Sequence, residues 1–291
     1  MCGALSWGYA RDYRPYFPPG WSGKADYFEW RILGTPAQRI AHLAFPNGIP
    51  ITFAGTKFVL DPSSRHDLRL AMVLRSGRAY EQATLQAMKR ILPIGGTFVD
   101  VGTNTGFFTA MLGCHVGAEG QIYAFEPNPQ AYSRLKGNIE VNGLENVAAF
   151  NVGLSDHSST EVLRIHEADD GTASLHMDEG REVSVALARG DDMIDRKPDL
   201  IKIDVEGHEI PAIQGLSRSL ESAALIVEWN PEYASDALFG ELTSRYPHLC
   251  AITEDRSGTL SLQSILRRQD LRFACNLLCT HRPPPRTPGI P

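Results

Sequence analysis

A short apolar run followed by a glycine turn carries the clearest chemical signal in this chain. Phe98, Val99 and Val101 are typical of a strand that is buried on both faces. Gly102 lets the backbone turn sharply and approach a ligand without a Cβ in the way. A helix is expected to begin soon afterwards, and its free N–H groups would attract a carboxylate or a phosphate. The stretch therefore predicts a site for a ligand with an anionic group.

The residues after this glycine set the start of the helix and the distance to an acid. Thr103 or Asn104 can cap a helix that runs from about 105 to 113. Glu126 lies 20 residues past Gly106, at the end of the next apolar run. A carboxylate at the end of this second strand can accept hydrogen bonds from both hydroxyls of a ribose. The spacing thus indicates a ligand that contains a ribose.

Two classes of ligand fit this arrangement, and the glycine spacing separates them. A dinucleotide site requires G-x-G-x-x-G, because the second glycine lets the backbone press against a pyrophosphate. Asn104 stands at that second position, and Asp100 adds a negative charge that would repel a pyrophosphate. S-adenosylmethionine instead brings a sulfonium and an ammonium for Asp100, a carboxylate for the helix end and a ribose for Glu126. The alternative is a parallel-sheet turn whose glycines serve only the backbone geometry.

Six stretches of the chain resemble the FkbM-type S-adenosylmethionine-dependent methyltransferases. They cover about residues 80 to 232, in the order expected for that family. The stretches are Tyr80-Glu81, FVDVGTNTGFF (98–108), YAFEPNP (123–129), NVGLSD (151–156), DLIKIDVEGHE (199–209) and LIVEWNP (225–231). KIDVEGHE is the most specific of them, since the glycine turn alone matches many class I methyltransferases. Thr103 departs from the alanine that is usual in the family.

The resemblance also implies which residues contact the methyl donor. It places adenine contacts at the end of the third strand, where Ser155 and Asp156 can bond the ring edge and Leu154 can cover a ring face. A plain turn is the alternative for that segment. The full set of expected cofactor-binding residues is Glu81, Asp100, Gly102, Thr103, Asn104, Thr105, Gly106, Glu126, Pro127, Asn128, Ser155, Asp156 and Asp204.

A second chemical centre is expected between Lys202 and Glu209. Ligands of open α/β sheets bind outside the carboxyl ends of the strands, and this stretch ends a strand and enters a helix. Asp204 should face the amino-acid portion or the methyl group of the donor. Glu206 and His208 follow on the loop, within reach of an acceptor hydroxyl. The simpler interpretation is a helix first-turn charge for Glu209 and a solvated loop side chain for His208.

A hydroxyl acceptor must lose its proton during methyl transfer, and the sequence offers two ways to remove it. His208, Glu206 or Glu228 can act as a general base and contribute on the order of 10²- to 10⁴-fold. Alternatively, Asp204, Glu228 and Asn230 form an oxygen-rich set that resembles the magnesium site of catechol-type O-methyltransferases. Mg²⁺ is possible on this basis, but the base mechanism is favoured. Asp204 is expected to be catalytic in either mechanism.

Composition restricts the class of protein further. The 291 residues carry a net charge of -6 without clusters of Lys and Arg, which argues against a nucleic acid partner. No stretch reaches the ~20 apolar residues that span a bilayer, and residues 1–17 lack the apolar core of a signal peptide. We therefore expect a cytoplasmic protein. Five cysteines without metal-type spacing, among them Cys275 and Cys279 in an apolar run, favour buried reduced thiols over a disulfide.

Alternating strand and helix patterns predict an α/β fold, with a class I methyltransferase Rossmann-like sheet and helices on both faces. Strands are expected at 97–101, 121–125, 147–152, 199–204 and 223–228, and helices at 80–92, 105–113, 129–141 and 209–219. The stretch 161–185 is expected to form a β-rich insertion. Residues 249–253 and 275–280 can supply the last two strands, and the resemblance implies seven strands with an antiparallel final one.

Three segments are expected along the chain. Residues 1–79 form an aromatic-rich N-terminal extension or cap with one strand pair, 51–53 and 57–60. This extension can be a lid over an apolar acceptor, a contact in a homo-oligomer or an ordinary cover for the sheet edge. Residues 80–282 form the S-adenosylmethionine-binding domain, and the proline-rich residues 283–291 form a disordered tail.

Together these features predict an S-adenosylmethionine-dependent O-methyltransferase that acts on a hydroxyl of a small-molecule natural product or a sugar. The resemblance alone implies this class of acceptor. The alternatives are an N-methyltransferase on the same scaffold, a nucleotide-dependent oxidoreductase, and a donor-binding module without catalytic activity. Such a module would bind the donor and form no product.

Overall fold

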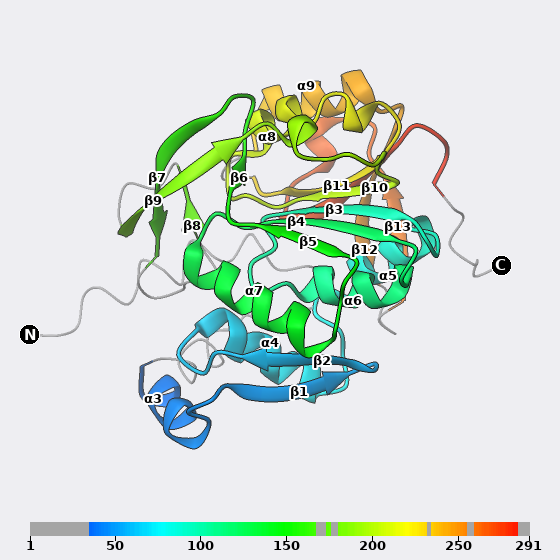
Figure 1. The fold of residues 1–291 in the computed structure, drawn as a ribbon. Coiled ribbons are helices and arrows are strands. Elements are labelled where there is room, and N and C mark those ends of the chain that lie inside the picture. Colours follow the sequence, from blue (N-terminus) through cyan, green and yellow to red (C-terminus); the bar gives the residue numbers. More distant parts are fainter. Residues whose placement is uncertain (1–34, 167–172, 176–179, 232–233, 255–258, 285–291) are drawn as a thin grey trace, which may run out of the picture.

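The computed structural model describes residues 35–166, 173–175, 180–231, 234–254 and 259–284. Its central element is an eight-stranded sheet with the order β13-β12-β14-β11-β10-β3-β4-β5 (Figure 1). The strands are β3 (Thr97–Val101), β4 (Gln121–Phe125), β5 (Val147–Phe150), β10 (Leu200–Ile203), β11 (Ala224–Trp229), β12 (His248–Glu254), β13 (Leu260–Ser264) and β14 (Cys275–Thr280). All seven predicted strands are present.

The direction of each strand confirms the predicted class I methyltransferase sheet. The five strands from β5 to β11 are parallel neighbours, and β14 inserts antiparallel between β11 and β12. Every residue of β3 and β10 is buried, as expected for central strands covered on both faces. The strand count of seven is corrected to eight, because β13 adds an antiparallel edge to β12. The alternating Leu-Ser-Leu pattern of β13 is too short to predict a strand from the sequence alone.

Helices cover both faces of the sheet, as predicted (Figure 1). On one face lie α5 (Gln82–Ile91), α6 (Phe107–Val116) and α7 (Pro129–Val141), and on the other lie α8 (Glu209–Gly215) and α9 (Asp236–Arg245). The prediction did not include α9. It also placed the start of α6 two residues too early, because Gly106 occupies the N-cap position in the left-handed region, without a side-chain cap from Thr103 or Asn104.

The predicted β-rich insertion is a separate small sheet. Its strands are β6 (Gly153–Leu154), β7 (Ser159–Ile165), β8 (Ala173–Ser174) and β9 (Arg181–Ala188), in the order β6-β9-β7-β8. The long β7–β9 ladder is antiparallel, and its buried Leu163, Ile165, Val185 and Leu187 form a small apolar cluster. Since β6 directly follows the end of β5, this sheet lies beside the carboxyl edge of the central strands (Figure 1).

The described part of the N-terminal segment packs onto the same face as α5, α6 and α7. It comprises α3 (Thr35–Ala44), the predicted hairpin β1 (Ile49–Phe53) and β2 (Thr56–Leu60), and α4 (Arg65–Arg75). The two helices were not predicted. The backbone N–H groups of Lys57 and Val59 donate to the side chains of Asn142 and Asn138, which attaches β2 to the end of α7. Buried residues of β1, β2 and α4 share one hydrophobic cluster with α5 and α6.

Some expectations fall on residues outside the described ranges. Three of the aromatic side chains behind the proposed lid or oligomer contact, Trp7, Trp21 and Trp30, precede residue 35, and most of the expected tail follows residue 284. Among the described cysteines, Cys114, Cys250, Cys275 and Cys279 are free thiols, and burial raises the pKa of Cys275 to about 12. Of the two cysteines in the apolar run, Cys279 is buried and Cys275 is half-buried. No helix within the described residues is long and apolar enough to cross a membrane.

Candidate functional site

The register of three parallel strands brings the two motifs of the sequence together. Lys202 on β10 is paired with Asp100 on β3 and with Ile226 on β11. Two residues further along, Asp204 and Glu228 occupy neighbouring positions where β10 and β11 end, because Ile203 and Val227 are paired just before them. Side chains separated by two residues share one face of a sheet. The acids from both motifs therefore point to the same side at the carboxyl edge.

The glycine turn has the predicted backbone conformation, but the main reason for Gly102 differs from the expected one. Its φ is +80°, in the left-handed region that favours glycine. A Cβ at this position would overlap the backbone carbonyl oxygen of Asp204. Gly106, with φ +83°, similarly leaves room for the side chain of Leu135 on α7. Gly102 thus allows the close contact between the two motifs as well as the turn.

Glu126 lies at the end of β4 and holds the glycine turn through backbone hydrogen bonds. Its Oε2 accepts from the N–H of Asn104 at 2.7 Å, and its Oε1 accepts from the N–H of Asn128 at 2.9 Å. The side chain is buried, and burial raises the pKa of Glu126 to about 7 against these two hydrogen bonds, which lower it. The carboxylate keeps further lone pairs for a ligand, since each oxygen can accept two hydrogen bonds.

The residues that follow Glu126 have clear structural roles. Asn128 caps α7 by accepting a hydrogen bond from the N–H of Gln130 at 3.1 Å, and the helix begins at Pro129, a favoured first position. The side chain of Asn151 donates to the carbonyl oxygens of Glu126 and Pro127. These contacts fix the loop between β4 and α7 beside the glycine turn.

Asp100 is buried within β3, and the half-buried Glu81 lies at the start of α5. The Oε2 of Glu81 accepts a hydrogen bond from Asn276 on β14 at 2.8 Å, and the Oδ2 of Asp100 accepts from Thr109 on α6 at 2.6 Å. Burial raises the pKa of both carboxyl groups. Glu81 has a positive φ of 44° at the N-cap of α5, a conformation that non-glycine residues adopt at a cost.

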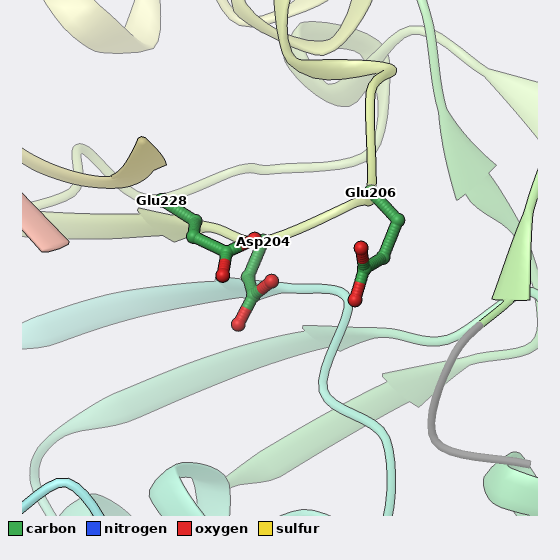
Figure 2. Close-up of side chains that lie close together, drawn as sticks. All are labelled: Asp204, Glu206 and Glu228. Atoms are coloured by element: carbon green, nitrogen blue, oxygen red, sulfur yellow. The ribbon is translucent and has the colours of Figure 1, made fainter. Parts of the chain in front are cut away.

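Asp204, Glu206 and Glu228 form a compact group of carboxylates. One ligand oxygen from each lies within 4.8 Å of the other two, and Figure 2 shows the three side chains pointing to the same side of the chain. Glu206 occupies the left-handed region with a φ of 50°, and its carbonyl oxygen accepts a hydrogen bond from Ser174 on β8. Burial and then the charges of Asp204 and Glu206 raise the pKa of Glu228 well above its usual value.

Two residues of the metal set expected from the sequence, Asp204 and Glu228, lie together, and the carboxylate of Glu206 joins them. The expected Asn230 lies directly after β11, where its carbonyl oxygen accepts from the N–H of Ala234. Three carboxylates at this separation have the oxygen chemistry that a hard cation prefers, although acidic groups also gather at sites without a metal.

His208 contacts the segment that follows β6. Its Nε2 lies 3.1 Å from the hydroxyl oxygen of Ser155, and Ser155 in turn donates to Asp156. Asp156 also bonds His157, and this hydrogen bond lowers the pKa of Asp156. The KIDVEGHE loop is therefore tied to the segment after β6, where adenine contacts were expected. Glu209 is buried and accepts from the N–H of Gly207, which supports its interpretation as a helix-start residue.

Sequence reasoning missed Lys202, Asn276 and Thr109, which contact the predicted acids. Lys202 forms an ion pair with Asp204 at 2.6 Å, and its side chain is only 3% exposed. The KIDVEGHE motif contained a signal for it, since a lysine inside an apolar strand is almost always paired. Asn276 and Thr109 lie in β14 and α6, where nothing in the local pattern separates them from ordinary polar residues.

The family comparison agrees with this site. The model of the methyltransferase FkbM domain matches residues 100–248, which contain both motifs and more than half of the chain. The chain belongs to the FkbM methyltransferase family. The matched region begins at Asp100 and ends at the start of β12, so it includes the glycine turn, Glu126 and the carboxylate group, whereas Glu81 and Asn276 lie outside it.

Individual relatives of this FkbM methyltransferase are more distant. A hexuronic acid methyltransferase of Haloferax volcanii is 31% identical over 135 residues, which are 44% of this chain and 53% of the relative. A methyltransferase of Beauveria bassiana is 28% identical over 149 residues, 43% of this chain and 59% of the relative. The chain thus matches little more than half the length of these two proteins. The crystal structure of an FkbM methyltransferase from Methylobacillus flagellatus is 15% identical with a TM-score of 0.44, and the alignment covers 72% of this chain and 60% of that one.

Proposed function

We propose that this protein is an S-adenosylmethionine-dependent O-methyltransferase that methylates a hydroxyl of a small-molecule natural product or a sugar. The observation that carries the proposal is the geometry at the carboxyl edge of the sheet. There the glycine turn and Glu126 adjoin a group of carboxylates on the next two strands. One part of this edge suits a nucleoside with two cationic groups, and the adjoining part suits a group that must lose a proton.

The donor part of the site fits the chemistry of S-adenosylmethionine. Among the residues that the structure describes, the Oδ1 of Asp100 and the hydroxyl of Thr105 are buried and lack a hydrogen-bond partner. Buried polar atoms are normally paired, so these two are suited to receive a ligand. Glu126 would hold the ribose, and Glu81, Asp100 and Asp204 would attract the donor's cations. The donor, when bound, supplies an electrophilic methyl group on its sulfonium.

In this proposal Glu206 accepts the proton of the acceptor hydroxyl. Glu206 lies in one group with Asp204 and Glu228, and the raised pKa of Glu228 favours the protonated form of that neighbour. Glu206 is half-buried and stands at the tip of the loop beside these groups, in a strained backbone conformation of the kind that clusters at functional sites. A positioned general base contributes on the order of 10²- to 10⁴-fold to the rate.

The class of acceptor is supported by the relatives. The name of the Haloferax volcanii protein describes an enzyme that acts on a hexuronic acid, which is a sugar derivative. Carboxylates such as Glu206 and Glu228 can accept hydrogen bonds from the hydroxyls of a polyol. Both points favour a hydroxyl-rich acceptor.

A calorimetric titration followed by an acceptor screen tests this proposal. The protein should bind S-adenosylmethionine, and NAD should not compete, because Asn104 and Asp100 disfavour a pyrophosphate. The screen pairs each alcohol acceptor with its amine analogue and uses an isotope-labelled donor. The control variant Glu145→Ala changes an exposed acid outside the site and should bind the donor as the wild type does. Absence of donor binding would overturn the proposal, and label only on the amines would replace it with N-methylation.

A further inference from the structure

Lys202 is a buried cation among the acids of the proposed site. It lies in the central strand β10, and its Nζ is 2.6 Å from the Oδ2 of Asp204. The ammonium also lies 5.3 Å from the ring centroid of Phe108, close enough for a cation–π contact. A lysine with a 3% exposed side chain has lost its hydration, so these contacts must replace it.

Carboxyl groups face Lys202 from several packed elements. Asp100 is its register partner on β3, and Asp204 directly follows β10. Glu81 is the N-cap residue of α5, and Glu228 lies near the end of β11. Burial alone would lower the pKa of Lys202, but the charges of Asp204, Glu81 and Asp100 raise it above its usual value. In return, the lysine charge opposes the effect of burial at Glu81, Asp100 and Glu228. Tyr80 also lies near Glu81 and Asp204, and burial raises its pKa.

We infer that Lys202 is a positioning residue of the transferase centre, an internal counter-ion that holds the carboxylate of Asp204 in place across the strand ends. The inference rests on the proposed function, because it assumes that Asp204 faces the methyl donor. In this arrangement the ammonium supplies within the protein the positive charge that a divalent cation would otherwise bring to the carboxylates. Asp204 has one oxygen bound to Lys202, and the other is left for the donor.

The two halves of the ion pair can be removed in turn. Lys202→Met keeps the length of the side chain and removes its charge, and Lys197→Met is the matched control at an exposed lysine five residues earlier. We expect Lys202→Met to weaken binding of S-adenosylmethionine about tenfold or more, since Asp204 loses the ion-pair partner that holds its carboxylate. Lys197→Met should bind as the wild type does.

The double variant Lys202→Met/Asp204→Asn separates positioning from stability. It removes both charges, so its thermal midpoint should return towards the wild-type value while donor affinity stays low. This variant also serves if Lys202→Met alone does not fold. Recovery of donor affinity together with stability would overturn the inference, because the pair would then be only structural. Wild-type donor affinity in Lys202→Met would overturn it too.

Two further results distinguish this inference from the proposed function. If the wild type fails to bind S-adenosylmethionine, the proposed function is wrong, and the inference that depends on it fails with it. If the wild type binds and turns over, but a chelator removes turnover and Mg²⁺ restores it, the proposed function stands and the counter-ion role of Lys202 is wrong.

Discussion

Replacement of Glu126 should weaken donor binding in a manner that depends on pH. The Glu126→Gln variant keeps the size of the side chain and removes the charge that would accept the ribose hydroxyls. A hydrogen bond to a charged group contributes about 1.5 to 3 kcal/mol, which corresponds to a loss of roughly 10- to 150-fold in affinity. The true effect should lie toward the upper end, because the new amide N–H₂ would also face the N–H groups of Asn104 or Asn128.

The raised pKa of Glu126 gives the wild type a pH dependence that the variant lacks. With a pKa of about 7, most Glu126 side chains are protonated at pH 6 and ionised at pH 8. Wild-type affinity should therefore rise about tenfold over that range, since the ionised form is the better acceptor. The same raised pKa also makes the stability of the folded protein depend on pH. Between pH 4.5 and about 7 the unfolded state releases the Glu126 proton before the folded state does, so the free energy of unfolding falls as pH rises over this range.

Isothermal titration of S-adenosylmethionine into both proteins at several pH values measures both effects. Titration of the donor's own amine affects both proteins equally and cancels in the ratio of their affinities. Thermal unfolding of the variant, which should be flatter with pH between 4.5 and 7, verifies that the buried group is the one that titrates. Equal affinities of the two proteins at pH 8, or a ratio that does not change with pH, would refute the assignment of Glu126 to the ribose.

Three further predictions follow from the same edge of the sheet. Gly102→Ala should destabilise the fold by about 1 to 3 kcal/mol in thermal unfolding, because the added Cβ meets the carbonyl oxygen of Asp204. The control Gly137→Ala, on the open face of α7, should be neutral or stabilising. In steady-state kinetics Glu206→Gln should lower kcat about a hundredfold or more and His208→Ala by much less, and the reverse order would make His208 the base. Turnover should survive a chelator, and its loss with restoration by Mg²⁺ would assign a metal to the carboxylates.

The sequence sufficed for the elements that carry strong periodicity. The central strands and α7 have the expected bounds to within two residues at each end, because their apolar runs are bounded by glycine, proline or asparagine. α9 and β13 were missed, since short amphipathic segments near the end of the chain resemble loops. The start of α6 was misplaced because Thr103 and Asn104 are common caps, and only the structure shows that Asn104 instead turns with a positive φ of 50°.

Part of the candidate site could likewise be predicted from the sequence, and part could not. The placement of Glu126, Asp204 and Glu228 at the carboxyl ends of neighbouring strands could be predicted, because strand ends in a parallel sheet meet at one edge. The contact between Gly102 and the carbonyl oxygen of Asp204 and the pairing of Lys202 with Asp100 could not, since these partners lie about 100 residues apart in sequence and become neighbours only through the strand register. The contact between His208 and Ser155 could not be predicted either, because the two residues lie 53 positions apart in sequence.

Transfer of a labelled methyl group to oxygen tests the proposed function most directly. The wild type and Glu206→Gln would be incubated in parallel with trideuteromethyl-labelled S-adenosylmethionine and a panel of sugars and small-molecule alcohols. Tandem mass spectrometry then locates the label in any product. We predict label on a hydroxyl oxygen with the wild type and a yield at least about a hundredfold lower with Glu206→Gln. Label on nitrogen or carbon, or equal yields from both proteins, would contradict the proposed reaction at this site.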